Sequence, residues 1–322
     1  MQAIRVHQCG EPEAMVLETL PTPEPGPGQA LIRVSAAGIN FIEVYQREGH
    51  YPLPLPTAMG GEGAGVVERL GPGDSPVRVG DRVAWVSGLG SYATEVIVPT
   101  DRLVPLPAHI NDRLAAAVML QGLTAHYLSR SSYPLKPGDT CLVHAAAGGV
   151  GQLLCQMAKL AGARVIGTVS TKEKAAIARA AGADETINYE EEDFVERTKA
   201  FTGGAGVQVV YDGVGKNTFS RGLDCLALRG YMVLFGGSSG PVEPMDPLIL
   251  SHKGSLYLHR PKLWDFIVTR DDLLLRSTEV FGWIESGKLK VRIAATFPLA
   301  EACDAHRLLV SREAAGKILL IP

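Results

Sequence analysis

The sequence predicts an α/β protein built in two parts, and two patterns along the chain lead to this prediction. Residues 1–35 hold short apolar runs interrupted by the segment PTPEPGPGQA, and apolar runs separated by proline- and glycine-rich turns are typical of turn-rich β-structure. From about residue 139 the pattern changes to a repetition of strand, glycine turn, helix and strand. This alternation indicates a parallel sheet covered by helices on both faces. A chain of 322 residues is long enough for one large or two ordinary domains.

The first part continues as β-structure and then becomes helical. Glycine-bounded runs rich in β-branched residues predict further strands over 62–71 and 77–86. Residues 104–131 then become helical in pattern, and Asn111 is the expected cap of a helix that begins at Asp112.

The second part is expected to contain five strands and four helices. The short apolar runs that predict the strands are 140–145, 164–169, 209–214, 231–237 and 255–260. The helical stretches between them are 150–161, 172–181, 190–200 and 217–228. After Pro261 the chain is predicted to be helical to about residue 286, and it then ends in the apolar runs RIAATFPL and KILLIP.

The stretch HAAAGGVG, residues 144–151, forms the turn between the first strand and the first helix of this part. The helix that follows carries one apolar face, and Gly162 is its expected end; the face consists of Leu153, Leu154, Met157, Ala158 and Ala161. Glycines at a strand-to-helix turn let backbone amides approach a pyrophosphate at the helix N-terminus. The stretch reads AxxGxxG, with Ala146 in place of the usual first glycine, and a plain turn of small residues is the alternative. Within a βαβ unit the pattern favours dinucleotide binding.

The end of the second strand indicates which dinucleotide binds. An NAD site usually places Asp or Glu there, whereas this chain reads GTVSTKEK over residues 167–174. Ser170 and Thr171 offer hydroxyl groups, and Lys174 offers a positive charge that attracts a 2′-phosphate. We therefore predict NADPH rather than NADH. The alternative is that Lys172 and Lys174 are ordinary solvated residues on an exposed first turn.

Composition excludes several classes of function. The formal net charge of −3 gives no electrostatic reason to expect nucleic acid or an anionic membrane as the main partner. No apolar run reaches the roughly 18 residues that span a bilayer, and the N-terminus lacks an apolar signal core. The five cysteines are scattered, without metal or redox spacing, and are expected to be free thiols. A cytoplasmic protein is therefore expected.

Eight stretches together resemble the zinc-independent, ζ-crystallin-like quinone oxidoreductases of the medium-chain dehydrogenase/reductase superfamily, above all the bacterial NADPH:quinone reductases. They cover essentially the whole chain: 36–52, 60–67, 80–85, 122–128, 144–163, 209–215, 234–240 and 254–261. The resemblance implies a GroES-like, partly open β-barrel domain over 1–120, to which 262–322 returns. It also implies an inserted, doubly wound Rossmann domain over 121–261, with the active site between the two domains.

The same resemblance implies that no metal is bound. Zinc-dependent members of the superfamily place Cys and His ligands where this chain reads Gly38-Ile39-Asn40 and Gly60-Gly61-Glu62, and their four-cysteine lobe is missing because residues 86–100 contain no cysteine. Zinc needs three or four converging ligands, and none can be assembled here by spacing. Glu62 remains, and its expected role is structural.

Without zinc, the expected chemistry is hydride transfer from nicotinamide to an acceptor that needs little activation, such as a quinone. By resemblance, the expected catalytic residues are Asn40, Tyr45, Tyr51 and Thr124. The expected cofactor-binding residues are Phe41, Tyr45, Tyr127, Gly148, Gly149, Val150, Gly151, Ser170, Thr171, Lys174, Tyr189, Val214, Phe235, Gly236, Ser238, Ser239, Leu258, His259, Arg260 and Arg312. For the tyrosines the alternative is core packing, and for Arg260 and Arg312 it is a surface ion pair. Gly213 stands where relatives often carry a side chain with a hydroxyl group. Any contact that such a side chain makes is expected to be lost in this chain.

Other functions remain open at the level of sequence. An NADPH-dependent 2-alkenal or enoyl double-bond reductase would share the scaffold and the cofactor site. An RNA-binding role would need a basic groove with exposed aromatic residues, which the net charge and the 6% aromatic content do not favour. A third alternative is a structural dimer without turnover. The resemblance implies a homodimer that pairs through the last Rossmann strand, GSLYLHR, because an open apolar edge strand invites association.

Overall fold

The computed structural model describes all 322 residues, and its contacts divide the chain into two compact units. Unit 1 contains residues 1–120, 269–285 and 291–322, and unit 2 contains 121–268 and 286–290. Residues 262–268 and 286–290 thus group with unit 2, although the sequence analysis assigns all of 262–322 to the first domain. No helix has the length and apolar character that crossing a membrane requires.

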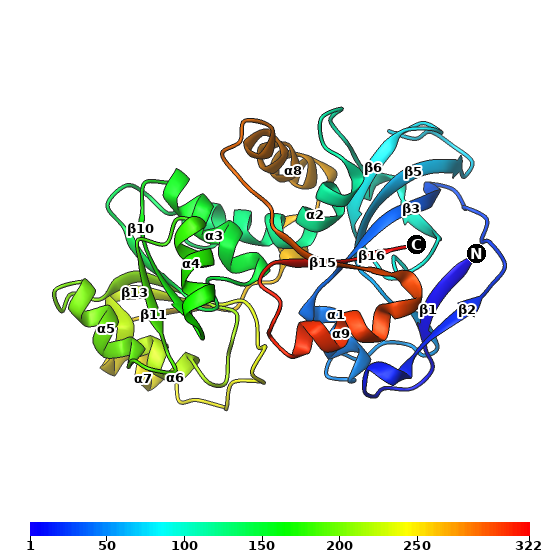
Figure 1. Ribbon diagram of the computed structural model, residues 1–322. Coiled ribbons are helices and arrows are strands. Elements are labelled where there is room, and N and C mark those ends of the chain that lie inside the picture. Colours follow the sequence, from blue (N-terminus) through cyan, green and yellow to red (C-terminus); the bar gives the residue numbers. More distant parts are fainter. The chain divides into compact units, whose positions relative to one another are not determined.

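Unit 1 is built on a seven-stranded sheet in which the end of the chain pairs with its beginning (Figure 1). The sheet has the order β15-β16-β3-β5-β6-β8, with β7 also paired to β3. Its strands are β3 (Gln29–Ile39), β5 (Glu62–Leu70), β6 (Arg82–Val86), β7 (Glu95–Pro99), β8 (Val104–Pro105), β15 (Ile293–Pro298) and β16 (Lys317–Ile321). A smaller sheet pairs β1 (Gln2–Val6) with β2 (Met15–Thr19) and β4 (Thr57–Ala58).

Three α-helices lie within unit 1: α1 (Phe41–Arg47), α8 (Arg270–Glu285) and α9 (Ala302–Val310). A fourth, α2 (Asp112–Tyr127), begins in unit 1, and its residues 121–127 belong to unit 2. The expected cap of α2 is confirmed, because the Asn111 side chain accepts a hydrogen bond of 2.9 Å from the Leu114 N–H. The expected helix after Pro261 begins only at Arg270, and α1 and α9 were not expected. Both are short, at seven and nine residues.

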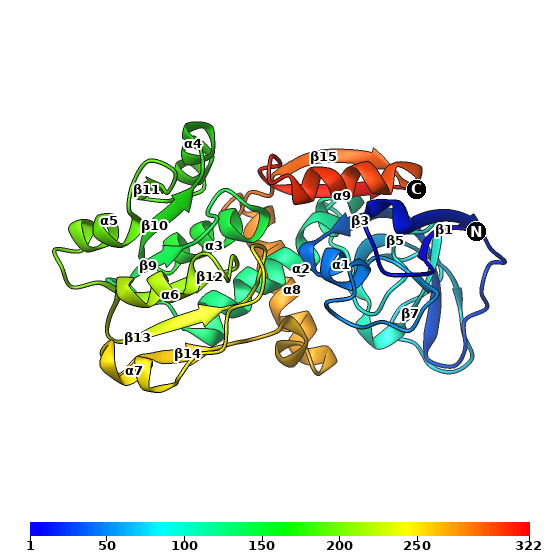
Figure 2. The same ribbon diagram turned by 90° about the horizontal axis from the view of Figure 1, so that it is seen from below.

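Unit 2 is an open sheet of six parallel strands in the order β11-β10-β9-β12-β13-β14. In chain order this is 3-2-1-4-5-6, the arrangement of a doubly wound dinucleotide-binding domain. The strands are β9 (Thr140–Val143), β10 (Arg164–Val169), β11 (Glu185–Asn188), β12 (Val207–Asp212), β13 (Leu226–Leu234) and β14 (Tyr257–His259). Figure 2 shows β14, in yellow, at one edge of the sheet. The predicted α/β fold class is confirmed, and β11 is the strand that the sequence analysis missed.

The helices of unit 2 are α3 (Gly149–Leu160), α4 (Lys172–Ala180), α5 (Phe194–Phe201), α6 (Phe219–Gly222) and α7 (Leu248–His252). The predicted apolar face of α3 is buried, and Gly162 adopts a φ of 79° just beyond its end. The prediction of a helix over 217–228 was too long. The chain leaves α6 for a short 3₁₀ turn and enters β13 at Leu226, because the strand pairs with β12 from there.

Candidate functional site

The glycine turn after β9 brings two backbone segments into close approach. A Cβ added to Gly151 would lie 2.9 Å from the Cα of Ala146, so no side chain fits there without a backbone shift. The left-handed residue of the turn is Ala145, with a φ of 53°, rather than a glycine. Gly148 is the N-cap of α3. The turn itself carries no large side chain at the start of α3, and the Gln121 side chain packs against Gly149 there, so a helix N-terminus suited to an anion is bordered by one carboxamide.

Ala146 occupies the place of the usual first glycine, and a glycine on the next strand compensates for it. A Cβ added to Gly167 in β10 would lie 2.6 Å from the Ala146 Cβ. Ala146 is fully buried, and its N–H donates to the Thr168 carbonyl at 3.0 Å. The departure from the motif is thus accommodated because Gly167 leaves room for the Ala146 methyl group.

The polar residues predicted after β10 lie together. The Thr171 hydroxyl caps α4 by accepting the Lys174 N–H at 3.2 Å, and Lys174 Nζ donates to Ser170 Oγ at 3.0 Å. Tyr189, after β11, donates its N–H to the Val169 carbonyl at 3.1 Å, and its side chain is 43% exposed. A cation, two hydroxyl groups and an exposed ring therefore gather at the carboxyl ends of β10 and β11.

One carboxylate lies on the same turn. Glu173 is exposed, and hydrogen bonds from its own backbone N–H and from the Thr171 hydroxyl lower its pKa. The carboxylate is therefore ionised at neutral pH. The charged side chains of this turn are therefore two cations, Lys172 and Lys174, and one anion, Glu173.

A buried aspartate organises the turn after β12. Asp212 is fully buried, and its Oδ1 accepts the N–H groups of Val214 at 2.7 Å and Gly215 at 3.0 Å. The Thr218 hydroxyl donates to the same carboxylate at 2.8 Å. Sequence reasoning missed this residue, although an Asp at the end of an apolar strand was the available signal. Asp212 holds the backbone that carries Val214.

The turns after β12 and β13 are hydrogen-bonded to each other. The Ser239 N–H and hydroxyl both donate to the Val214 carbonyl at 2.8 Å, and the Ser238 N–H donates to Gly213 at 3.2 Å. A Cβ added to Gly213 would lie 2.8 Å from the Phe235 ring. The glycine that departs from the family pattern therefore makes room for this aromatic ring, and Gly236 follows it in the same turn.

Residues at the ends of α2 and β14 form a second group in unit 2. Tyr127 is 2% exposed and stacks on Phe266, with ring centroids 4.3 Å apart, and burial raises its pKa. His259 Nδ1 lies 2.7 Å from Ser132 Oγ, whereas Leu258 is 40% exposed. The core-packing alternative describes Tyr127 well. The remaining predicted residues in unit 2 are Thr124, which is buried, and Arg260, which is exposed.

In unit 1 the predicted site residues lie at the beginning and just beyond the end of α1. Asn40 is its N-cap, and the rings of Phe41 and Tyr45 lie 6.2 Å apart. Tyr51 donates its N–H to the Tyr45 carbonyl, and the two rings meet edge to face at 5.5 Å. Tyr51 is 43% exposed, so it offers an aromatic surface to a ligand. Arg312 is exposed beyond α9.

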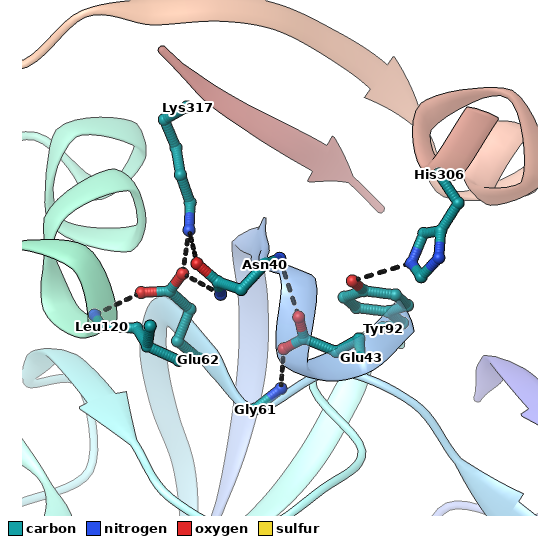
Figure 3. Close-up of polar contacts among 8 residues, drawn as sticks. All are labelled: Asn40, Glu43, Gly61, Glu62, Tyr92, Leu120, His306 and Lys317. Carbon is teal, nitrogen blue, oxygen red and sulfur yellow. Dashed lines mark hydrogen bonds and ion pairs between the residues drawn. The ribbon is translucent and has the colours of Figure 1, made fainter. Parts of the chain in front are cut away.

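Asn40 belongs to a buried group of polar and charged side chains that we call the Asn40 cluster: Asn40, Glu43, Glu62 and Lys317 (Figure 3). Glu62 Oε1 accepts from Lys317 Nζ and, at 2.7 Å, from Asn40 Nδ2. Burial raises the pKa of Glu43 to about 7, helped by the Glu62 charge and opposed by Lys317. Sequence reasoning assigned Glu62 a structural role and missed both Glu43 and Lys317. No motif marks Lys317, whereas Glu43 stands three residues after Asn40, in the spacing of a capping box, and this was the available signal.

No group of three or more His, Cys, Asp or Glu side chains lies close enough to hold a metal ion. In the two segments where the resemblance implies zinc ligands in other members, the structure has the Asn40 carboxamide, which accepts a hydrogen bond from Lys317, and Gly61. The Gly61 N–H donates to Glu43 at 3.2 Å.

This chain matches known proteins over its full length. The chain matches the family model for the alcohol dehydrogenase GroES-like domain over 26–108 and the model for zinc-binding dehydrogenase over 149–269. It is 47% identical to quinone oxidoreductase 1 of Escherichia coli over 99% of both chains, and 41% identical to a 2-haloacrylate reductase of Burkholderia over 100% of this chain and 99% of the relative. The crystal structure of the E. coli enzyme complexed with NADPH superposes with a TM-score of 0.98 at 46% identity, covering both chains completely. As the resemblance predicted, the chain belongs to the quinone oxidoreductase family of the medium-chain dehydrogenase/reductase superfamily.

Proposed function

We propose that this protein is an NADPH:quinone oxidoreductase that transfers a hydride directly, without a metal ion. The observation that carries the proposal is the full-length match to a quinone oxidoreductase crystallised with NADPH, at 46% identity and a TM-score of 0.98. The glycine turn and the polar residues after β10 fit such a cofactor. The turn stands at a helix N-terminus, which favours a pyrophosphate, and the residues after β10 supply a positive charge for a further phosphate.

On the cofactor side, the residues of unit 2 would bind NADPH and orient it. The backbone amides at the start of α3 would hold the pyrophosphate, and Gly151 lets α3 pack closely against the backbone of Ala145 and Ala146. Ser170, Thr171 and Lys174 would hold the 2′-phosphate, with the ammonium group supplying charge. NADPH supplies the hydride when it is bound. The turns that carry Val214 and Phe235 would shape the remainder of the site.

On the acceptor side, the residues of unit 1 supply orientation and hydrogen bonds. Tyr45 and Tyr51 present edge-to-face rings suited to a flat conjugated acceptor. The Asn40 carboxamide would donate to an acceptor oxygen or orient the nicotinamide amide. A quinone needs little further help, because its reduction product is aromatic and its oxygens can take protons from water.

Reduction of an activated carbon–carbon double bond is the second candidate. It is favoured by the 2-haloacrylate reductase that is 41% identical over the whole of this chain. The cofactor side would be unchanged, and only the acceptor group would differ.

The deciding experiment measures NADPH oxidation by chelator-treated protein against 1,4-benzoquinone, a naphthoquinone, an α,β-unsaturated aldehyde, an enoyl thioester and 2-chloroacrylate. Turnover confined to the quinones is expected. Turnover confined to the other three acceptors would move the function to double-bond reduction, and no turnover with any acceptor would overturn an enzymatic role.

A homodimer paired through β14 is proposed as the working assembly. The strand is the edge of the sheet, and Tyr257 and Leu258 on it are 50% and 40% exposed. Leu228 on the neighbouring strand β13 is 80% exposed, which extends the apolar surface. Sedimentation equilibrium tests this: Leu258→Lys should shift the mass towards the monomer, and an unchanged mass would exclude β14. The cytoplasm is the proposed compartment, because all five cysteines are unpaired.

A further inference from the structure

The Asn40 cluster contains an ion pair that is almost completely buried. The side chains of Lys317 and Glu62 are 1% and 0% exposed, and Asn40 is 4% exposed (Figure 3). Removing two charges from water is costly, and a buried pair is often no more stabilising than apolar residues of the same volume. Stability alone therefore does not account for an ammonium and a carboxylate at this place, and their contacts with Asn40 need a separate explanation.

The pair determines which way the Asn40 carboxamide points. Lys317 Nζ donates to Asn40 Oδ1 at 2.8 Å, and Asn40 Nδ2 donates to Glu62 Oε1 at 2.7 Å. If the amide were flipped, its NH₂ would face the ammonium and its oxygen would face the carboxylate. Both contacts would be repulsive in a poorly solvated site, so only one orientation is favourable.

Glu62 is itself held by three separate segments of the chain. Its Oε2 accepts the N–H of Leu120 in α2 at 2.6 Å, and its Oε1 accepts from Lys317 on β16 and from Asn40 before α1. A Cβ added to Gly38 on β3 would lie 2.6 Å from the Glu62 Cδ, so this strand leaves space for the carboxylate. The carboxylate therefore has little freedom to move.

We propose that Lys317 and Glu62 are positioning residues, which hold the Asn40 carboxamide in a single orientation for the electron acceptor. The inference rests on the proposed function, in which Asn40 faces the reacting groups. It also explains why the cluster stands at the N-cap of α1, whose residues Phe41 and Tyr45 belong to the same acceptor surface.

The kinetic test compares Glu62→Gln/Lys317→Met, which removes both charges together, with two other variants. Tyr92→Phe is the matched control: it removes a buried hydrogen bond of 3.2 Å to His306 in the same unit and leaves Asn40 untouched. Lys317→Arg keeps the positive charge. Each protein is measured for kcat and KM with 1,4-benzoquinone, for NADPH Kd, and for melting temperature.

The double variant should lose about 100-fold in kcat, because a misplaced reacting group costs about that factor. Its NADPH Kd should stay within about twofold, since the pyrophosphate and 2′-phosphate residues are unchanged. Lys317→Arg should recover part of the loss, and Tyr92→Phe should keep the parent kcat. A folded double variant with the parent kcat would overturn the proposal.

A second measurement does not depend on turnover or on a variant of Lys317 or Glu62. The chain has four asparagines, so selective ¹⁵N-asparagine labelling yields four side-chain amide pairs, assigned with Asn40→Asp. In the parent protein the Asn40 amide hydrogens should exchange far more slowly than those of the exposed Asn111 and Asn217. Exchange as fast as Asn111 would overturn the positioning role. A parent protein that shows slow exchange but reduces no quinone would instead overturn the proposed function alone.

Discussion

The two units bury charge in different ways. Unit 1 buries Glu43, Arg47, Glu62 and Lys317. Two of these, Glu62 and Lys317, form a direct ion pair with each other. In unit 2 the buried carboxylates are Asp139 and Asp212, and both accept backbone N–H groups of their own turns. No lysine, arginine or glutamate is buried in unit 2.

The difference is one of distance along the chain. Asp212 is satisfied by residues two to six positions away, whereas Asn40 and Lys317 are 277 positions apart. Local hydrogen bonds shape the proposed cofactor turns, and they form when the turn forms. The proposed acceptor side depends on contacts between distant segments, so it is complete only when the C-terminal strand has paired with the N-terminal sheet.

The largest expected effect comes from breaking the buried pair on one side. Lys317→Met leaves Glu62 buried without its ammonium partner, and we expect the free energy of unfolding to fall by about 3–5 kcal/mol. Urea denaturation of the purified protein measures it. Adding Glu62→Gln to this variant should restore most of the loss, because the uncompensated charge is then gone. Equal losses in the single and double variants would mean that packing, not charge, is affected.

The next largest effect is a pH dependence that belongs to unit 1. The pKa of Glu43 is raised to about 7 from 4.5, so between these values the folded state binds more protons than the unfolded state. The stabilising contribution is complete below pH 4.5, and about 3 kcal/mol is lost as the pH rises to and beyond 7. Lys317, Glu62 and Tyr92 are the charged and titratable groups around this carboxyl.

Glu43→Gln isolates that contribution, because other titrating groups cancel in the difference. His306 is one of them: burial lowers its pKa to about 3, so it destabilises the fold as pH falls below 6.5. The variant should gain stability relative to the parent between pH 5 and pH 8, as measured by urea denaturation. A difference that does not change with pH would show that the Glu43 pKa is ordinary.

A smaller effect is expected from the glycine turn of unit 2, where two neighbouring glycines serve as a matched pair. Gly151→Ala brings a Cβ against the backbone of Ala146 and should cost about 1–3 kcal/mol of stability, with weaker NADPH binding. Gly149→Ala meets only the flexible end of Gln121, so its cost should be smaller. Thermal unfolding and fluorescence titration with NADPH distinguish them. Equal effects would indicate that the close approach does not limit the turn.

The smallest effect concerns the cation after β10. Lys174→Glu should weaken NADPH binding about tenfold and leave NADH unchanged, because only NADPH carries a 2′-phosphate. The effect should shrink at 1 M salt, where exposed charges are screened. Lys172→Glu is the control, because Lys172 is exposed and Lys174 is the lysine whose Nζ bonds Ser170. Parallel losses for both variants would mean that net charge alone matters.

Sequence patterns determined unit 2 well. The strand-and-helix alternation and the glycine turn predicted its parallel sheet, and the buried face of α3 followed from periodicity. These features depend on neighbours in the chain, which is why periodicity and turn chemistry report them. The missed strand β11 and the short helix α6 lie where tertiary pairing overrides a weak local pattern.

Tertiary structure alone decided the environment of Asn40. Nothing near Lys317 in the sequence KILLIP indicates a buried ammonium, and the expectation for an isolated lysine is a solvated one. Antiparallel pairing of β16 with β3 places it beside Glu62 and Asn40. The sequence by itself therefore determined the family, the fold class and the glycine turn, whose contacts are local. The contacts of the carboxamide were decided by the sheet, because its partners come from opposite ends of the chain.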